Sequence, residues 1–92
     1  MSTTIETVEN ALALARIRLS AAPNFEIFAS SVAQLEYLLS VLQGKETDRS
    51  RLKTIIVGHF AVREFEESDP ELAELLIAAQ GIASKMAKGL KV

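Results

Sequence analysis

The apolar residues of this chain recur at the alternating three- and four-residue spacing of one helical face. The clearest run covers residues 25–42, and Gly44 follows it where a left-handed C-cap is expected. Similar runs cover residues 5–19 and 72–86. The pattern therefore predicts three amphipathic helices. Their apolar faces are Ile5, Val8, Leu12, Ala15 and Leu19; Phe25, Phe28, Val32, Leu35, Leu39 and Leu42; and Leu72, Leu75, Leu76, Ala79, Ile82, Ala83 and Met86.

Two of these helices carry N-terminal signals. Thr3 is a good N-cap residue, and Glu6 three residues later completes a capping box. Asp69 is a good N-cap for the last helix, with Pro70 at the first helical position and an acidic residue, Glu71, in the first turn. We therefore predict that the first helix begins after Thr3 and the last one after Asp69.

Residues 49–66 are harder to assign. The β-branched run 54–57 favours a strand, but a lone strand among helices has no partner. We therefore predict a third helix, capped by Thr47 or Asp48 and antiparallel to the fourth because the connection between them is very short. Its expected face is Leu52, Ile55, Ile56, His59, Val62 and Arg63, with Phe60 and Phe65 pointing to other sides.

The fold class predicted for residues 1–92 is all-α: a single domain folded as a small antiparallel four-helix bundle. The composition agrees, because 49% of the residues are apolar but only 5% are aromatic. A core built from Leu, Ile, Val and Ala suits closely packed helices. A chain of 92 residues buries a smaller fraction of its unfolded surface than a larger domain does, so each apolar position matters for stability.

Composition also narrows the function. The net charge of -2 provides no basic surface for nucleic acid. No cysteine and a single histidine, His59, leave no ligands for a thiolate or multi-histidine metal site. His59 has no catalytic partner near it in sequence, and no phosphate-binding loop or nucleophile motif is present. We therefore expect neither an enzyme nor a bound cofactor, and we interpret His59 as a structural or interface residue.

The chain is also expected to stay in the cytoplasm. Its longest uncharged stretch, residues 75–84, is about half of what a membrane span needs. The N-terminal segment is polar and acidic, unlike a signal peptide.

The strongest candidate for a site is an acidic run of six carboxylates within eleven residues. Helix-dipole complementation explains Asp69 and Glu71 but not Glu64, Glu66 and Glu67, which lie at the end of the third predicted helix. The spacing lacks the alternating oxygen ligands of a calcium loop. Two interpretations remain open at this point: a solvated loop, or a surface that steers a cationic partner.

Nearly end to end, the chain resembles a family of bacterial immunity proteins. The resemblance is carried by Ala11–Leu14, Arg18-Leu19, Pro23, Gln34-Leu35, Tyr37, Ser40–Leu42, Asp48–Ser50, Gly58, Ala61–Phe65, Ser68–Leu72 and Gly89–Val92. Members of this family neutralise an NAD(P)-degrading effector toxin of the type VI secretion system. The resemblance implies an all-helical, non-catalytic protein of the bacterial cytoplasm. It also implies that the partner is the catalytic domain of a cognate effector, whose access to NAD⁺ or NADP⁺ the protein blocks.

Combined with the acidic run, the resemblance suggests a site. Glu64, Glu66, Glu67 and Asp69 would compete for the basic groups of a dinucleotide site, and Asp48, Arg49, His59 and Phe60 are weaker candidates for the rim or centre of the interface. The alternative is a small helical adaptor or homodimerisation module without a toxin partner. A weak homo-oligomer of the free protein is compatible with either function.

Overall fold

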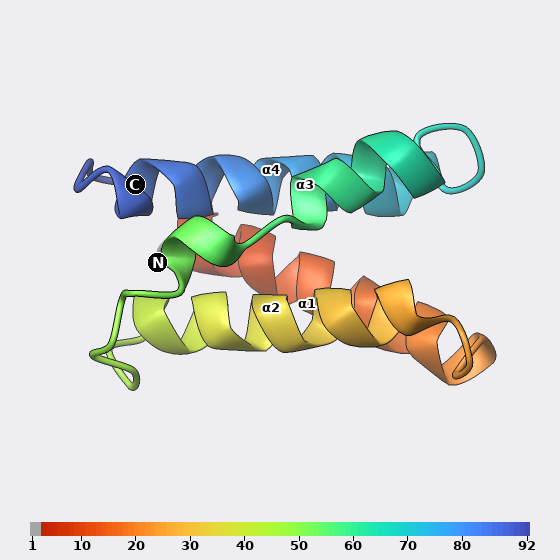
Figure 1. The fold of residues 1–92 in the computed structure, drawn as a ribbon, viewed down its shortest axis with the longest axis horizontal. Helices are drawn as coiled ribbons and strands as arrows, with labels where there is room; N and C mark the ends of the chain where they lie inside the picture. Colours follow the sequence, from red (N-terminus) through yellow and green to blue (C-terminus); the bar gives the residue numbers. More distant parts are fainter. Residues whose placement is uncertain (1–2) are drawn as a thin grey trace.

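Three long helices make up most of the fold: α1 (Thr3–Ala21), α2 (Glu26–Leu42) and α4 (Pro70–Ala87) (Figure 1). A computed structural model of the protein describes residues 3–92. Between α2 and α4 lie a 3₁₀ turn, η1 (Leu52–Thr54), a short helix, α3 (Val57–Phe60), and a π turn, η2 (Ala61–Phe65). Residues 3–92 contain no strand, which confirms the predicted all-α class.

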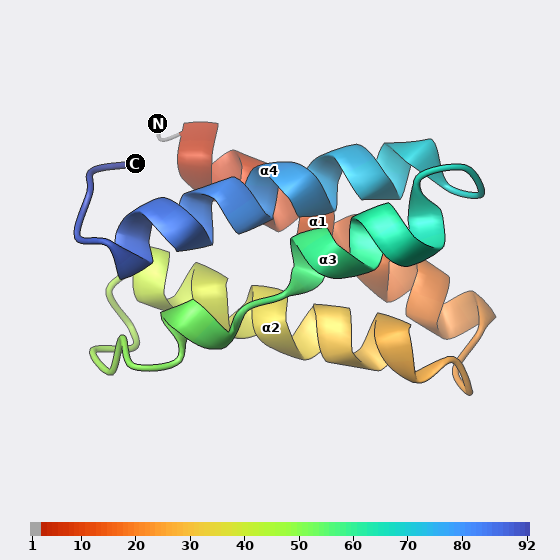
Figure 2. The same ribbon diagram turned by 45° about the horizontal axis from the view of Figure 1, so that its top comes forward.

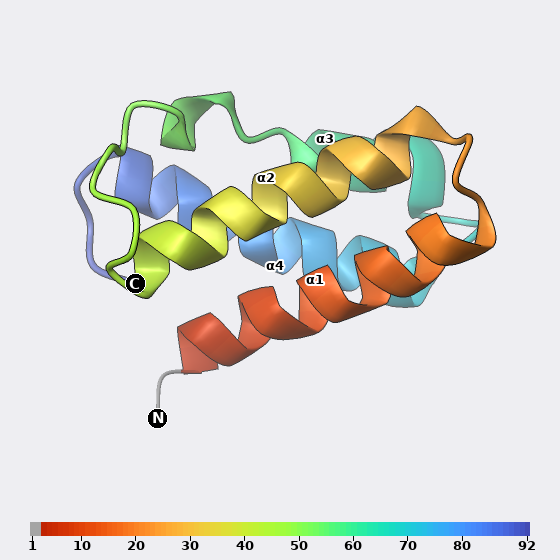
Figure 3. The same ribbon diagram turned by 90° about the horizontal axis from the view of Figure 1, so that it is seen from below.

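The helices alternate in direction along the chain. The turn between α1 and α2 and the turn between η2 and α4 lie at the same end of the molecule, on the right of Figure 1. Figure 3 shows α1 beside α2 with α4 behind them, and Figure 2 shows α3 between α2 and α4. Helix α1 packs on both α2 and α4, while α3 and η2 pack mainly on α4. The predicted antiparallel arrangement of the third and fourth helices is confirmed.

The core contains most of the positions that the spacing predicts, but Phe25, expected on the face of the second helix, is 37% exposed. Most of the buried side chains are small or branched aliphatic ones, joined by Tyr37, Phe65 and Met86, and the helices pack closely. Helix α2 buries a wider face than expected, because Leu38 and Val41 are also covered. The buried residues of the three long helices are Val8, Ala11, Leu12, Ala15; Ser31, Val32, Leu35, Tyr37, Leu38, Val41; and Leu72, Ala73, Leu76, Ala79, Ala83, Met86.

The helix ends follow most of the sequence signals. Gly44 has φ of 75°, the left-handed conformation predicted for it, and Gly89 after α4 has a similar φ of 76°. Asp69 is the N-cap of α4, and its carboxylate accepts from the Leu72 N–H at 3.4 Å. The prediction that Thr3 is an N-cap was wrong, because α1 already includes Thr3.

The predicted helix over residues 49–66 was wrong in its first half. Residues 49–51 form a turn, and Ile55 is extended with ψ of 124°. Helix α3 begins only at Val57, the last residue of the β-branched run, because such side chains lose χ1 freedom in a helix. Asp48 therefore does not cap this helix; its Oδ1 accepts from the Ser50 N–H at 2.9 Å and caps a turn instead.

Two glutamines hold the extended link before α3. Gln80 of α4 donates through Nε2 to the Ile55 carbonyl at 2.8 Å and accepts from the Gly58 N–H at 3.0 Å. Gln34 of α2 accepts from the Ile56 N–H at 2.7 Å. These side-chain amides replace hydrogen bonds that a regular helix would have supplied to its own backbone.

The late start of α3 sets which side of the segment is buried. Val57, Ala61 and Phe65 are buried, whereas Ile56 and Val62, expected on the core face, are 45% and 59% exposed. The predicted face was therefore right for Leu52 and Ile55, which are buried, and wrong for the residues after them. The predicted helix began about eight residues too early. The extended link before Val57 breaks the helical spacing, so residues before and after it do not share one helical face.

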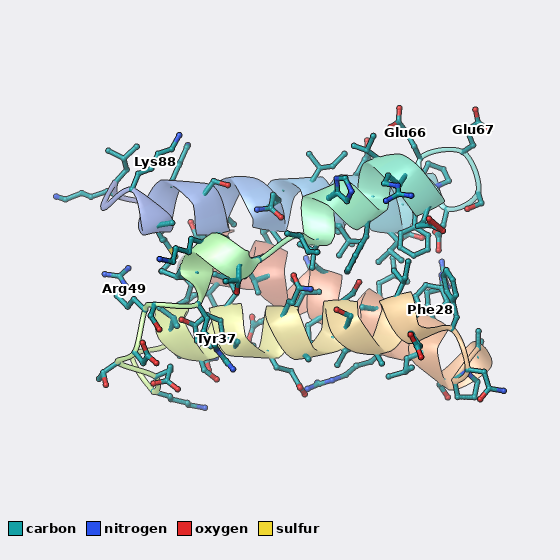
Figure 4. The ribbon with its side chains drawn as sticks, viewed as in Figure 1. Phe28, Tyr37, Arg49, Glu66, Glu67 and Lys88 are labelled. Carbon is teal, nitrogen blue, oxygen red and sulfur yellow. The ribbon has the colours of Figure 1, made fainter. Side chains whose placement is uncertain are left out.

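Phe65 anchors the end of η2 to α2. Its ring stacks on Phe28 with centroids 5.3 Å apart, and Phe25 meets Phe28 edge to face at 5.0 Å. Figure 4 shows Phe28 at the same end of the molecule as Glu66 and Glu67. This aromatic cluster fixes the segment that carries the acidic run.

Candidate functional site

Three carboxylates of the acidic run form one exposed surface. Glu64 lies on η2, and Glu66 and Glu67 lie in the turn that follows it. Figure 4 shows Glu66 and Glu67 pointing away from the bundle. Within residues 3–92 no ion pair joins any of the three to a basic side chain. We call these three residues the acidic surface; with Val62, Arg63 and Ser68 they line a shallow hollow.

Asp69 lies in a different environment. Its side chain is only 17% exposed, and Oδ2 accepts from Arg18 Nε at 2.7 Å. Oδ1 accepts from Arg18 Nη2 and from the Leu72 N–H, both at 3.4 Å. The hydrogen bond from Arg18 lowers the pKa of the Asp69 carboxyl, aided by the Leu72 N–H. The Asp69 carboxylate therefore joins α1 to the start of α4 and is not free for a partner.

An apolar strip runs beside the acidic surface. We define this strip as Ile56, His59 and Val62, all exposed on the outward side of α3 and η2. Val62 also lines the acidic hollow, so the strip and the acidic surface are continuous. Phe60, in contrast, is half-buried and packs against the core. His59 is thus available for contact with a partner, while Phe60 mainly supports α3.

Asp48 and Arg49 lie far from the acidic surface. Figure 4 places Arg49 at the opposite end of the molecule from Glu66 and Glu67. The Asp48 carbonyl accepts from the Tyr37 hydroxyl at 2.7 Å, and hydrogen bonds from Ser50 lower the pKa of its carboxyl. The eight predicted site residues therefore do not form one patch. Of the eight, Glu64, Glu66 and Glu67 line one hollow, and His59 is exposed three residues before Val62, which lines the same hollow.

The described residues hold no recognisable metal centre or membrane helix. In residues 3–92 no three His, Cys, Asp or Glu side chains are grouped so that they could hold a metal ion. None of the helices in this range is long and apolar enough to cross a bilayer.

Sequence reasoning missed several residues that shape this face. Gln34 and Gln80 position α3, and Arg18 occupies the Asp69 carboxylate. Gln80 and Arg18 act 22 or more residues away in sequence, so helical spacing alone does not reveal them. The sequence does contain one indication of the role of Gln80: it is a polar amide within the apolar stretch of α4. Burying such an amide without a hydrogen-bond partner would cost free energy, so a partner was to be expected.

The chain is similar to proteins of one bacterial family over nearly its full length. The Tsi6 family profile matches residues 3–85. The immune protein Tsi6 of Pseudomonas aeruginosa strain PAO1 is 42% identical over 90 residues, covering 98% of this chain and 96% of that protein. A chain in a structure of Tse6 in complex with Tsi6 matches with a TM-score of 0.91 at 41% identity, over 98% of this chain and 96% of that one. A structure of Tsi6 from Pseudomonas aeruginosa matches with a TM-score of 0.85 at 41% identity, over 100% and 95% of the two chains. The protein described here belongs to the Tsi6 family.

Proposed function

We propose that this protein is the immunity partner of a type VI secretion effector related to Tse6. In this proposal it binds the effector's catalytic domain and blocks the entry of NAD⁺ or NADP⁺. Membership of the Tsi6 family and the similarity to a chain in a Tse6–Tsi6 complex support the pairing. The protein would act in the cytoplasm of the producing cell, where the effector's dinucleotide substrate is found.

The acidic surface is the observation that carries the proposal. Glu64, Glu66 and Glu67 are exposed, close in sequence and unpaired within the described chain. Glu64 lies in the last turn of the helical segment, and Glu66 and Glu67 directly follow it, at the end where added negative charge is slightly unfavourable. A site that binds a pyrophosphate is expected to be basic, because it must neutralise two phosphate charges. Three carboxylates at a protruding end have the charge and position to bind such a site in place of the dinucleotide.

The apolar strip gives the interface a second component. Exposed Val62 and Ile56 offer hydrophobic contact beside the charges, and His59 lies between them in sequence. Charged groups at an interface mainly raise the association rate, whereas desolvated apolar contacts mainly slow dissociation. The acidic surface should therefore attract the effector, and the strip should retain it.

A charge-neutralised variant tests this function. The effector domain encoded beside this protein is purified, and its NAD⁺ consumption is measured with the wild type and with Glu64→Gln/Glu66→Gln/Glu67→Gln. We expect the wild type to abolish consumption, and the variant to associate about tenfold more slowly at low salt. The difference should shrink as ionic strength rises, because salt screens exposed charges.

The control carries the same change in net charge at other positions. Glu6→Gln/Glu9→Gln/Glu46→Gln removes three exposed or partly exposed carboxylates outside the acidic surface. It should associate within about twofold of the wild type, since distant charges are screened. Equal rates for both triple variants would refute the role of the acidic surface. No binding by the wild type would refute the effector pairing and favour the adaptor function.

A further inference from the structure

A second surface lies between the outward sides of α1 and α4. Two hollows follow one another along these helices, and Thr4 of α1 and Val92 of the C-terminal tail also line the second. The first is lined by Leu14 and Ile17 of α1 and Leu75 of α4, and Ile17 is 59% exposed. The second continues at Ala78, Gly81 and Ile82 of α4. Together they form an apolar groove between two antiparallel helices.

The charges along the groove are opposite at its two ends. Glu71 and Glu74 line one end, and Lys85 lines the other. Glu71 and Lys85 are each seven residues from Ala78, which is about 10.5 Å along a helix. A two-fold axis at Ala78 would therefore bring Glu71 of one copy beside Lys85 of the other, twice by symmetry. The groove is charge-complementary to itself in the antiparallel orientation.

The glycine at position 81 is consistent with the close approach of another helix. It lies in the interior of α4, where glycine weakens a helix relative to alanine. A Cβ added at Gly81 would meet nothing within 4 Å, so the fold of the single chain does not require glycine there. Gly58 differs, because a Cβ there would lie 2.7 Å from the Gln80 side chain.

We propose that the free protein forms a two-fold homodimer through this groove, with α4 of one copy antiparallel to α4 of the other. Leu14, Ile17 and Leu75 supply the apolar contact, and the Glu71–Lys85 pairs set the orientation. The acidic surface lies on η2 and the following turn, outside the groove residues. The proposed dimer therefore uses none of the three residues of the acidic surface.

Sedimentation equilibrium of the purified protein between about 1 µM and 1 mM tests the proposal, since that range covers weak protein association. The wild type should pass from monomer to dimer with concentration. Gly81→Glu should remain monomeric, because it places a bulky charge in the groove. Its melting temperature at low concentration should not fall, because glutamate is a better helix former than glycine.

Charge exchange tests the orientation. Glu71→Lys and Lys85→Glu should each weaken dimerisation about tenfold, because each replaces two attractions with two repulsions. The double variant should restore it. Lys53→Glu, an exposed charge reversal on η1, is the matched control and should leave dimerisation unchanged.

Three outcomes would overturn the proposal. The first is a wild type that stays monomeric over the whole range. The second is a dimer that persists in Gly81→Glu. The third is a double variant no better than the single ones. In the first case, capture of a different helical protein by the wild type but not by Gly81→Glu would assign the groove to that partner. None of these outcomes bears on effector inhibition, which is measured separately.

Discussion

The three long helices and the segment from residue 45 to residue 65 belong to one bundle but are held in different ways. The long helices bury continuous aliphatic faces, with Leu35, Leu38, Leu72 and Leu76 fully covered. The segment 45–65 also buries apolar side chains, among them Val57 and Phe65, but it depends in addition on hydrogen bonds from side chains of other helices. The candidate effector surface lies at the end of this second region and not on the long helices.

The difference shows how a small bundle can present an irregular surface. The long helices pack through apolar residues at regular three- and four-residue spacing. A change of backbone direction within them would break this spacing, so they offer little room for a protruding feature. In residues 55–58, Gln34 and Gln80 satisfy the backbone polar groups that a helix would have paired internally. The chain can therefore change conformation before α3 without leaving buried groups unpaired. That change turns Ile56 and Val62 outward.

The largest expected effect is in the long-helix core. Leu35→Ala should lower the free energy of unfolding by about 3 kcal/mol, because it removes a fully buried side chain and leaves a cavity. Urea denaturation measures the loss. Leu90→Ala is the control: Leu90 is 56% exposed, and its replacement should change stability by less than about 0.5 kcal/mol. Similar losses for both variants would contradict the core described above.

A smaller effect is expected where the two regions meet. Gly58→Ala should destabilise the protein by about 2 kcal/mol, because its Cβ would lie 2.7 Å from Gln80. Gly81→Ala in α4 should instead stabilise it by about 1 kcal/mol through helix propensity. Thermal melts at low protein concentration compare the two. If Gly58→Ala also stabilises the protein, Gln80 does not hold α3 as closely as the structure indicates.

The smallest effect concerns the ion pair between α1 and the start of α4. Asp69→Asn keeps an N-cap side chain but removes the charge that pairs with Arg18, and should cost about 1 kcal/mol at pH 7. The pKa of Asp69 is lowered in the folded state, so its contribution is complete above the ordinary carboxyl pKa of about 4. It is lost as the pH falls through the lowered value.

The pH dependence provides the check on this pair. The stability difference between wild type and Asp69→Asn should be constant above about pH 5 and should shrink below pH 4. Melting temperatures between pH 2 and pH 8 measure it. A difference that grows on acidification would show that Asp69 is not stabilised as a carboxylate by Arg18.

Much of the fold follows from local sequence. The positions of α1, α2 and α4, most of their buried faces, the Asp69 cap and the left-handed Gly44 were all predictable. Each depends on residues within one or two turns of one another, and such signals are present in the linear chain. The candidate site was only partly predictable. Clustering in sequence identified Glu64, Glu66 and Glu67, but it also included Asp69, whose partner Arg18 is 51 residues away.

The sequence by itself determined that this protein is an all-α bundle with an acidic segment before its last helix, because helical periodicity and charge runs are local properties. Only the tertiary structure decided where α3 begins, which of its faces points to solvent and which carboxylates are free. Those features depend on Gln34, Gln80 and Arg18 reaching across to other elements. A side chain's partner in another helix depends on packing geometry, and a one-dimensional pattern carries no record of that geometry.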